Sequence, residues 1–495
     1  MKKKIFIICL VSVPVIFLIY LAGDFYYKDQ KNAGSISNKL RDAIPKDIKA
    51  FLKKTIFIVP TLKRENIMAT KDRDFILYKS RSLEKKYYLT LNHEKNKKNI
   101  EPDTIKLKDF LNKQISINSK KLNLQYFQVS SLTNPKHANA ISTAYLADYN
   151  DKIIFSSGDG DFYYFLKSDL SKKEFEAKKI KSNFNSIMQY PEFKQKGMYG
   201  IKDLFIKDNI LFATSSSEQK KNCFNTAIYS SKIDFSNLDF KKFYEPTLCV
   251  KKELAGIDEF SPYHSGGRLF NFDKEHILFS VGEWRNRPAA QDQSNNLGKI
   301  IKLNIETKTT KIMSMGHRNA QGLYYDNDKN TIISTEHGPA EGDEININKT
   351  ADKKVVNFGW PISSYGEHYA VARWRSKGVD QYAKAPLNKS HKKYGFQEPL
   401  KYYSPALGIS QIIKISKEFK INDGNEYFLG TMGSTSGKGL GLRYLRFDKD
   451  YSSIVDEQHF YLKERIRDIE YVESLNAYLL FFEISGSIGV LKHEN

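Results

Sequence analysis

Beyond about residue 122 the chain repeats one short pattern of apolar and polar positions. A polar turn precedes an apolar run of five or six residues, and a second, polar or basic strand-like segment follows it. Short runs bounded by turn residues are typical of antiparallel β-strands. The unit recurs six times, roughly 50 to 90 residues apart, with apolar runs at 152–157, 209–214, 276–281, 331–335, 426–430 and 477–482. This recurrence predicts an all-β, six-bladed β-propeller over residues 122–495.

Two other architectures fit this pattern less well. The units do not alternate with long amphipathic helices, as a doubly wound α/β sheet would require. A pair of β-sandwiches is the structural alternative, but six similar units favour radial repetition. In a propeller, loops from every blade converge at one end of the central channel, so a functional site is expected there.

The N-terminal pattern is different and predicts a membrane anchor. Three lysines at 2–4 precede an uncharged apolar run over 5–23, long enough to span a bilayer core of roughly 30 Å. An aromatic stretch at 25–27 follows, and a cleavable signal peptide is the alternative. Residues 1–28 are therefore expected to form a single-pass inner-membrane anchor, with the propeller in the periplasm. Residues 29–121 are expected to form a lysine-rich stalk or a small α+β region.

The charge balance points to an anionic partner. The chain has 78 basic and 57 acidic residues, a formal net charge of +21. Arginine is absent between Arg81 and Arg268 but frequent from there to Arg467. Since arginine binds carboxylates and phosphates through a planar fork, these residues indicate either surface ion pairs or a buried anion site. Nucleic acid is not the expected partner, because the domain is expected to face the periplasm.

Cys223 and Cys249 are the two cysteines outside the predicted anchor. An even pair in an oxidising compartment can form a disulfide, and strand-like segments between the two could bring them together. Two buried thiols are the alternative. Neither cysteine has the spacing of a metal site or the partners of a catalytic nucleophile.

Two loop segments carry polar residues that strands do not need. Residues 261–269 place His264 beside two glycines, where an imidazole can meet a ligand and titrate near neutral pH; a capping role is the alternative. Residues 334–344 gather four carboxylates around Gly-Pro and Gly. That oxygen-rich composition suits calcium, and a solvated acidic turn is the alternative.

A third polar segment, residues 464–468, contains two arginines at alternate positions. If it is a strand, Arg465 and Arg467 lie on the same face. Two like charges side by side need an anion, or a carboxylate such as Asp468, between them.

Together these segments resemble the glucose/sorbosone dehydrogenase family of soluble quinoproteins. The matching motifs, in family order, are H-S-G-G-R-L, G-H-R-N-A-Q-G-L, E-H-G-P-A-E-G-D-E, N-F-G-W-P-I-S-S-Y-G and E-R-I-R-D. The resemblance covers about residues 135–492. It implies a six-bladed propeller that holds pyrroloquinoline quinone (PQQ) and calcium.

The resemblance also implies a role for each matching residue. His264 is expected to be the general base that takes the substrate's hydroxyl proton as hydride moves to the quinone, and Glu283 is expected to orient it. PQQ is a tricarboxylate, so arginines and a divalent cation suit it chemically. The residues expected to hold the cofactor are Arg318, Asn319, Arg465 and Arg467.

Two calcium sites are implied in the same way. The backbone carbonyls of Gly338 and Pro339 are expected to bind the calcium that polarises the quinone. Glu344 and the carbonyl of Phe358 are expected to form a second, structural site.

Three positions depart from the family pattern. A glutamine in the second-blade turn is replaced by Met198, which cannot make the same hydrogen bonds. A fifth-blade lysine is missing from 430–434, although Lys438 is nearby. The acid expected beside the base is Glu283, where the family has aspartate.

Two main hypotheses follow for function. The first is a membrane-anchored PQQ- and calcium-dependent dehydrogenase that oxidises an aldose or a related alcohol or aldehyde and passes electrons to a quinone or cytochrome. The second is a calcium-stabilised propeller without a redox cofactor that binds a glycan or a protein. Hydrolysis of a lactone is a third possibility, to which no motif points.

Overall fold

The structure is a computed structural model that describes the chain from residue 103 to 494 with internal gaps. The described residues are 103–129, 132, 143–190, 192–193, 197–252, 260–340, 342–349, 354–368, 381–433 and 439–494. The predicted anchor at 1–28 and most of the predicted lysine-rich region at 29–121 lie outside them. Within the described ranges, no helix combines the length and the apolar character that a membrane crossing needs.

Antiparallel strands dominate the described residues and form six four-stranded blades. The first three blades, from inner to outer strand, are β3 (Ala144–Tyr149), β4 (Lys152–Ser157), β5 (Phe162–Leu166), β6 (Glu174–Ser182); β7 (Ile201–Lys207), β8 (Ile210–Lys220), β9 (Cys223–Lys232), β11 (Lys241–Tyr244); and β13 (Gly266–Asn271), β14 (His276–Val281), β15 (Lys299–Asn304), β16 (Thr310–Met315). The last three are β17 (Ala320–Asp326), β18 (Thr331–Glu336), β19 (Asp343–Lys349), β21 (Lys401–Tyr403); β22 (Ile409–Lys414), β23 (Asn425–Met432), β24 (Leu440–Phe447), β25 (Ile454–Tyr461); and β26 (Ile466–Val472), β27 (Ala477–Phe482), β28 (Ser487–His493), β2 (Lys120–Val129).

The remaining elements are short, apart from one long strand. That strand, β1 (Thr104–Ile117), pairs with β2 on one side and with β6 on the other. The others are β10 (Asn237–Leu238), β12 (Val250–Lys251), β20 (Val356–Asn357), α4 (Phe184–Ile187), α7 (Gln381–Lys384), η1 (Lys167–Ser171), η2 (Gly197–Tyr199), η3 (Pro262–His264), η4 (Arg287–Gln291), η5 (Asn327–Lys329), η6 (Lys392–Tyr394) and η7 (Glu473–Leu475).

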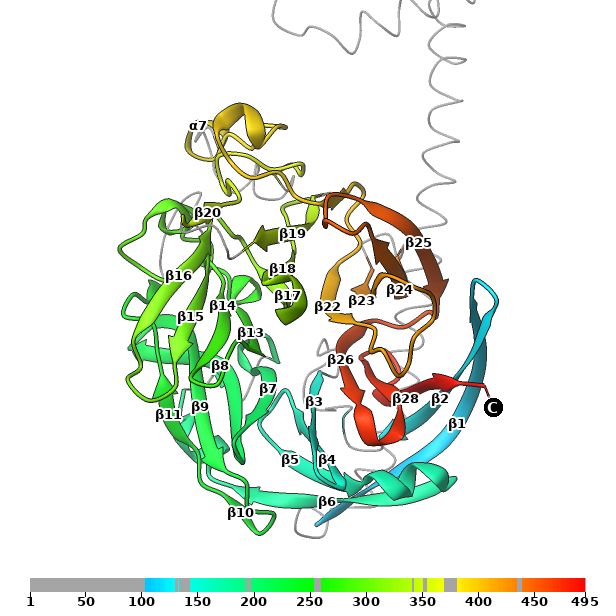
Figure 1. Cartoon of the computed structure of the whole chain (residues 1–495). Coiled ribbons are helices and arrows are strands. Elements are labelled where there is room, and N and C mark those ends of the chain that lie inside the picture. The colour runs from blue at the N-terminus through cyan, green and yellow to red at the C-terminus, as the bar shows by residue number, and fades with distance from the viewer. Residues whose placement is uncertain are drawn as a thin grey trace, which may run out of the picture. The chain divides into compact units, whose positions relative to one another are not determined.

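The six blades close into a ring. The innermost strands β3, β7, β13, β17, β22 and β26 each lie beside the next, and β26 lies beside β3 (Figure 1). The prediction of an all-β propeller from six recurring units is confirmed. Each predicted apolar run is the second strand of its blade, where both faces are covered by neighbouring blades. This position explains why all six residues of β27 are buried and apolar, whereas the outer strand β25 is partly exposed along its length.

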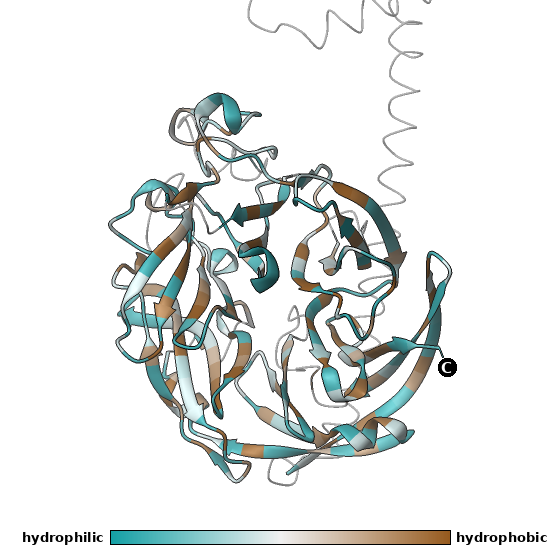
Figure 2. Cartoon of the chain, viewed as in Figure 1, coloured by the Kyte–Doolittle hydropathy of each residue, from teal (hydrophilic) through white to brown (hydrophobic). Residues whose placement is uncertain are grey.

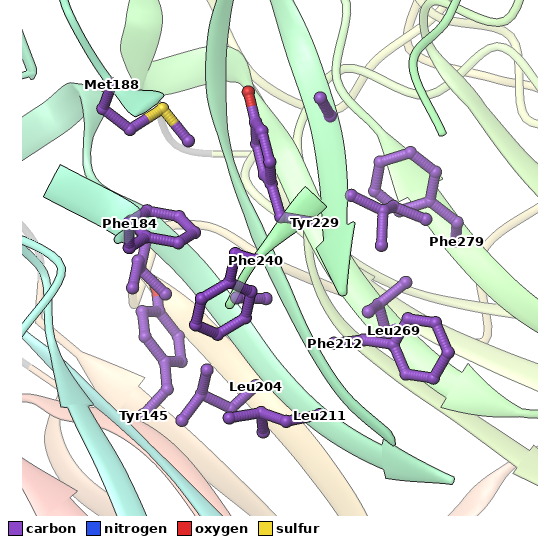
Figure 3. Close-up of a cluster of buried hydrophobic side chains, with 14 of the residues drawn as sticks. Tyr145, Phe184, Met188, Leu204, Leu211, Phe212, Tyr229, Phe240, Leu269 and Phe279 are labelled. Atoms are coloured by element: carbon purple, nitrogen blue, oxygen red, sulfur yellow. The ribbon is translucent and has the colours of Figure 1, made fainter. Parts of the chain in front are cut away.

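Apolar side chains from neighbouring blades fill the space between them. Figure 2 shows brown, apolar segments along the strands, interrupted by teal, polar ones. In Figure 3, Phe184, Phe212, Tyr229, Phe240 and Phe279 come together in one buried cluster. Since a propeller has no single central core, packing of this kind between each pair of blades holds the ring together.

The last blade combines both ends of the described chain. Its outer strand β2 comes from the N-terminal side and pairs with the C-terminal strand β28, with Leu124 opposite Leu491. The adjoining β1 continues the sheet to the first blade through Leu107 opposite Phe175. Residues before 122, assigned by sequence to the lysine-rich region, therefore contribute β1 and the start of β2 to the propeller sheet.

Five of the six innermost strands carry a bulge near their first residues. The pairing register slips by one residue in β7, β13, β17, β22 and β26. The extra residue is Lys202 in β7, Gln321 in β17 and Arg467 in β26. A bulge redirects side chains away from the regular alternation of a strand.

Cys223 and Cys249 form a disulfide. Cys223 begins β9, and Cys249 precedes β12, which pairs with β9 through Val250 opposite Phe224. Of the two alternatives that the sequence left open, the structure therefore shows the cross-link.

Removing this disulfide is expected to destabilise the propeller without changing its fold. The disulfide joins residues 26 positions apart. Without this cross-link the unfolded chain has more conformational entropy, which lowers the stability of the folded protein by about 3 to 4 kcal/mol. Denaturant titration of the Cys223→Ser/Cys249→Ser variant checks this. A reducing agent should produce the same loss in the wild-type protein and none in the variant; equal stability of oxidised and reduced wild type would contradict the prediction.

Candidate functional site

The predicted base and its predicted orienting acid are in direct contact. His264 ends the short turn η3 just before β13, and Glu283 follows β14. Since β13 and β14 pair antiparallel, the two residues meet, with His264 Nδ1 2.5 Å from Glu283 Oε1. The backbone is very close here: a Cβ atom on Gly282 would lie 2.0 Å from the His264 carbonyl oxygen. Any larger residue at 282 would push the pair apart.

Hydrogen-bond partners define which ring nitrogen of His264 can accept a proton. The Arg318 guanidinium lies with Nη2 2.9 Å from His264 Nε2. Because a guanidinium can only donate, Nε2 must be the accepting nitrogen and the ring proton must lie on Nδ1, facing Glu283. The pair therefore shares one proton, and Nε2 keeps the lone pair that a general base needs.

The electrostatic surroundings keep this imidazole neutral. Burial, followed by the charges of Arg318 and Arg285, holds the pKa of His264 well below 6.5. Burial raises the pKa of Glu283 to about 7, although Arg318 and Arg287 oppose the shift. A desolvated pair ringed by arginines is the kind of arrangement found at catalytic sites.

Arg318 and Asn319 lie on the loop between β16 and β17 and hold the base in place. The Arg318 backbone N–H donates to Glu336 Oε2 at 2.8 Å, and its guanidinium donates to the Gly338 carbonyl at 2.5 Å. Asn319 Oδ1 accepts from the Gly266 N–H at 3.0 Å. The two residues predicted to bind cofactor thus also connect the third and fourth blades beside His264.

Arg465 and Arg467 lie together, as their spacing predicted, but their partner is different. Both bind the buried Glu483, with Nε of Arg465 2.9 Å from Oε2 and Nε of Arg467 2.6 Å from Oε1. Burial opposes ionisation of Glu483, but the two arginines lower its pKa to about 2. The carboxylate suggested by sequence, Asp468, instead pairs with Arg268. The signal that was missed is a single acid directly after the apolar strand β27.

Arg467 also reaches across the channel. Its Nη1 donates to Gln321 Oε1, 3.0 Å away on the fourth blade. Gln321 in turn donates to Asn319 Oδ1 at 3.0 Å. A continuous polar network therefore connects the arginine pair to the loop that supports His264.

Arg268 is a further buried residue for which the sequence predicted no role. Its Nη1 lies 2.9 Å from Asp203 Oδ1 and 2.6 Å from Asp468 Oδ1, and the side chain is only 4% exposed. The two aspartates also accept from backbone N–H groups of Leu269 and Leu146. This ion triad joins the second, third and sixth blades, and the Arg268 guanidinium also donates to the carbonyls of Gln321 and Arg467.

The predicted calcium ligands do not form an open cation site as they are placed. The Gly338 carbonyl, predicted with Pro339 to bind calcium, accepts from Arg318 instead. Glu344, predicted with the Phe358 carbonyl, has His391 Nε2 3.3 Å from its Oε1. Over the described ranges, no three His, Cys, Asp or Glu side chains gather in a way that could hold a metal ion.

Two of the departures from the family pattern, Met198 and the missing fifth-blade lysine, lie in the predicted cofactor pocket. The carbonyl of Met198 accepts from the ammonium of Lys202, and its side chain packs against the apolar cluster of Figure 3. Lys438, named from sequence as a possible substitute for the missing fifth-blade lysine, lies outside the described residues.

Comparison with known proteins identifies the family of this chain. A family model described as Glucose / Sorbosone dehydrogenase matches residues 174–489, more than half of the chain. An uncharacterized protein, slr1608, of Synechocystis sp. is 27% identical over 248 residues, which are 46% of this chain and 55% of that protein. Aldose sugar dehydrogenase YliI of Escherichia coli is 26% identical over 238 residues, 46% of this chain and 59% of that protein. The chain thus spans less than two thirds of the length of these relatives.

Solved structures show the same fold. The apo form of the soluble aldose sugar dehydrogenase of Escherichia coli has a TM-score of 0.53 at 21% identity, covering 71% of this chain and 95% of that one. A glucose dehydrogenase has a TM-score of 0.53 at 20% identity, covering 71% and 96%. With the family model spanning both halves of the site, from Glu283 to Arg467, the chain belongs to the glucose/sorbosone dehydrogenase family.

Proposed function

We propose that this protein is a PQQ-dependent dehydrogenase that oxidises an aldose or a related alcohol or aldehyde. The observation that carries the proposal is the His264–Glu283 pair, with the lone pair of Nε2 directed at a cluster of arginines. A base of this kind, next to groups that bind a polyanion, suits oxidation of a hydroxyl-bearing substrate. Membership of the glucose/sorbosone dehydrogenase family supports the same reaction class.

His264 is the residue that moves the proton. Its Nε2 takes the proton of the substrate hydroxyl. Glu283, which accepts a hydrogen bond from Nδ1, stabilises the imidazolium that results. In the ligand-free protein, Arg318 donates to the same nitrogen. The substrate hydroxyl must therefore replace the guanidinium at Nε2 before the proton can move.

The residues of the site fit a polycarboxylate cofactor. Arg318, Arg465 and Arg467 bring three positive charges to one end of the channel, against the carboxylates of Glu283 and Glu483. PQQ, when bound, supplies the quinone that accepts the substrate's hydride. Arginine forks bind carboxylates in two-point fashion, so these three side chains would hold and orient the cofactor's carboxylates.

Calcium binding at these positions stays a prediction. Arg318 and His391 lie where cations would meet the predicted ligand sets of Gly338 and Glu344. Calcium at the first site would require Arg318 to move, and calcium at the second would require His391 to move.

The periplasmic location and the electron acceptor are also part of the proposal. The Cys223–Cys249 disulfide supports an oxidising compartment. A single-pass anchor over residues 1–28 would place the enzyme beside membrane quinones or cytochromes, either of which could take electrons from it.

Thermal unfolding of the full-length protein with and without PQQ tests this function. A ligand that binds only the folded protein stabilises it by about 2.7 kcal/mol at a hundredfold excess over Kd, so the melting temperature is expected to rise. The titration is run in calcium and again in chelator, followed by a sugar panel with dye reduction. Binding in both conditions would assign the anion site to the arginines alone.

Absence of any PQQ-induced shift would reject the dehydrogenase proposal. The same titration with oligosaccharides would then test the other hypothesis, a propeller that binds a glycan.

A further inference from the structure

In two of the innermost strands the bulged residue reaches into the central channel. In β17 and β26 these residues are Gln321 and Arg467, and their side chains meet across the channel at 3.0 Å. Lys202 is the bulged residue of β7, between Ile201 opposite Ser215 and Asp203 opposite Thr214. By position in its blade, Lys202 is the counterpart of Arg467.

The neighbours of Lys202 place it next to the base. Its Cβ would be 2.4 Å from a Cβ on Gly267, whose φ is +117°, so the lysine stem packs against the segment that follows His264. Its ammonium donates to the Met198 carbonyl in the turn η2. Turn η2 itself lies beside turn η3, which carries His264.

The surroundings of Lys202 disfavour its charged form. Burial, and then the positive charge of Arg467, lower the pKa of Lys202 to about 7. Its hydrogen bond goes to a neutral carbonyl, and the charged group acting on it is another cation. A lysine kept in such surroundings gains a partner when a carboxylate arrives.

We propose that Lys202 binds a carboxylate of the cofactor, together with Arg467 across the channel. This inference rests on the proposed function and adds to it a fourth cation, supplied by the second blade. In the ligand-free protein the Lys202 ammonium donates to the Met198 carbonyl in η2. To bind the cofactor, the ammonium has to leave this carbonyl and rotate toward the channel.

The proposal predicts a proton uptake on binding. In the free protein Lys202 is charged below about pH 7 and loses its charge above it. A bound carboxylate favours the charged form and raises the lysine pKa, so affinity should fall as the pH rises from 6 to 9.

The other ionisable groups on the elements packed against β7 are in defined states or common to all variants. Arg268 on β13 pairs with Asp203 and Asp468, and Arg467 on β26 pairs with Glu483. Burial raises the pKa of Tyr145 on β3 to about 12 and keeps it protonated. His264, beside η2, stays neutral. Asp203 and Glu283, whose pKa values burial raises to about 7, are present in every Lys202 variant, so Lys202→Met and Lys202→Arg are compared with wild type at the same pH. The buried Tyr199 of η2 has its pKa raised by burial and does not titrate in this range.

The test is the PQQ affinity of full-length Lys202→Met and Lys202→Arg at pH 6 and pH 9, measured by thermal shift and fluorescence quenching. Lys202→Met should weaken binding about tenfold to a hundredfold at pH 6, the loss of one charge-assisted hydrogen bond. At pH 9 the difference from wild type should shrink. Lys202→Arg keeps a permanent charge and should restore binding with a flatter pH dependence.

Lys207→Met is the matched control. Lys207 lies at the other end of β7, where its ammonium donates to Asn271 at 2.6 Å on the surface, and its loss should leave PQQ affinity unchanged. Melting of each ligand-free variant checks folding.

Two results would overturn the assignment and are distinguishable. If wild type binds PQQ and Lys202→Met binds it equally well at both pH values, Lys202 is not a binding residue and the proposed function stands. If wild type itself binds no PQQ, both fall together.

Discussion

Replacing His264 by asparagine is expected to lower kcat for sugar oxidation by about 10² to 10⁴, the usual contribution of a positioned general base. Asparagine is smaller but places an amide near the position of Nδ1, where it can still donate to Glu283, and it has no nitrogen that takes up a proton. Steady-state dye reduction with saturating PQQ measures the loss. The melting temperature should change little, because the substitution leaves the surrounding backbone contacts in place.

A matched substitution separates the chemistry from the loss of a histidine. His276 also pairs with a carboxylate, Asp273 at 2.8 Å, but on the exposed side of the third blade. His276→Asn should keep full activity. Comparable activity in both variants would contradict the role of His264.

The pH dependence of the activity is a second test of the His264–Glu283 pair. A second proton on the pair, taken up near pH 7, removes the Glu283 charge that stabilises the imidazolium. The value of kcat/KM, which reports the ligand-free enzyme, should therefore fall as the pH drops through about 7. In Glu283→Gln that limb should move well below pH 6.5, since only His264 then titrates. An unmoved limb would assign it to another group.

Replacing Arg268 by methionine is expected to destabilise the propeller by about 3 to 5 kcal/mol. The change leaves Asp203 and Asp468 buried and close together without the cation that lies between them. Denaturant titration measures the loss. It should become smaller at low pH, because protonation of either aspartate removes the repulsion.

The control for this prediction is Arg443→Met. Arg443 pairs with Glu457 at 2.6 Å between β24 and β25, where both side chains are more exposed than the triad, and its loss should cost less than the loss of Arg268. Converting the whole triad to Asp203→Asn, Arg268→Met and Asp468→Asn should recover much of the lost stability, because no buried charge remains. Equal stability of the Arg268 and Arg443 variants would show that the triad does not stabilise the propeller.

The fold could be predicted because its repeating unit is local. Each blade contains one fully buried second strand, so the apolar runs at 152–157 and 477–482 stand out from the polar turns around them. The strands β1 and β2 could not be assigned in the same way. Their partners, β6 and β28, lie far along the chain, and alternating lysines hide the apolar face of β1.

The site could be predicted in part for a similar reason. His264, Arg318 and Asn319 lie on loops next to glycines, where polar residues have no role in a strand. Glu483 and Lys202 were missed because their roles depend on contacts between blades and on a bulge, which period-two spacing does not reveal. His391, which faces Glu344, comes from a segment without any apolar period.

Closure of the ring through β2 has a consequence for how the chain matures. The strand made early, Lys120–Val129, has to wait for Ser487–His493 to be synthesised before its second edge is paired. The entropy of closing so long a loop grows only slowly with its length, so the delay affects the rate of folding more than the final stability. A chain that stops before residue 487 keeps an open sheet edge, which is a template for aggregation. Ring closure therefore makes the pairing of the last blade depend on the C-terminal strand, since only a chain that reaches β28 covers the second edge of β2.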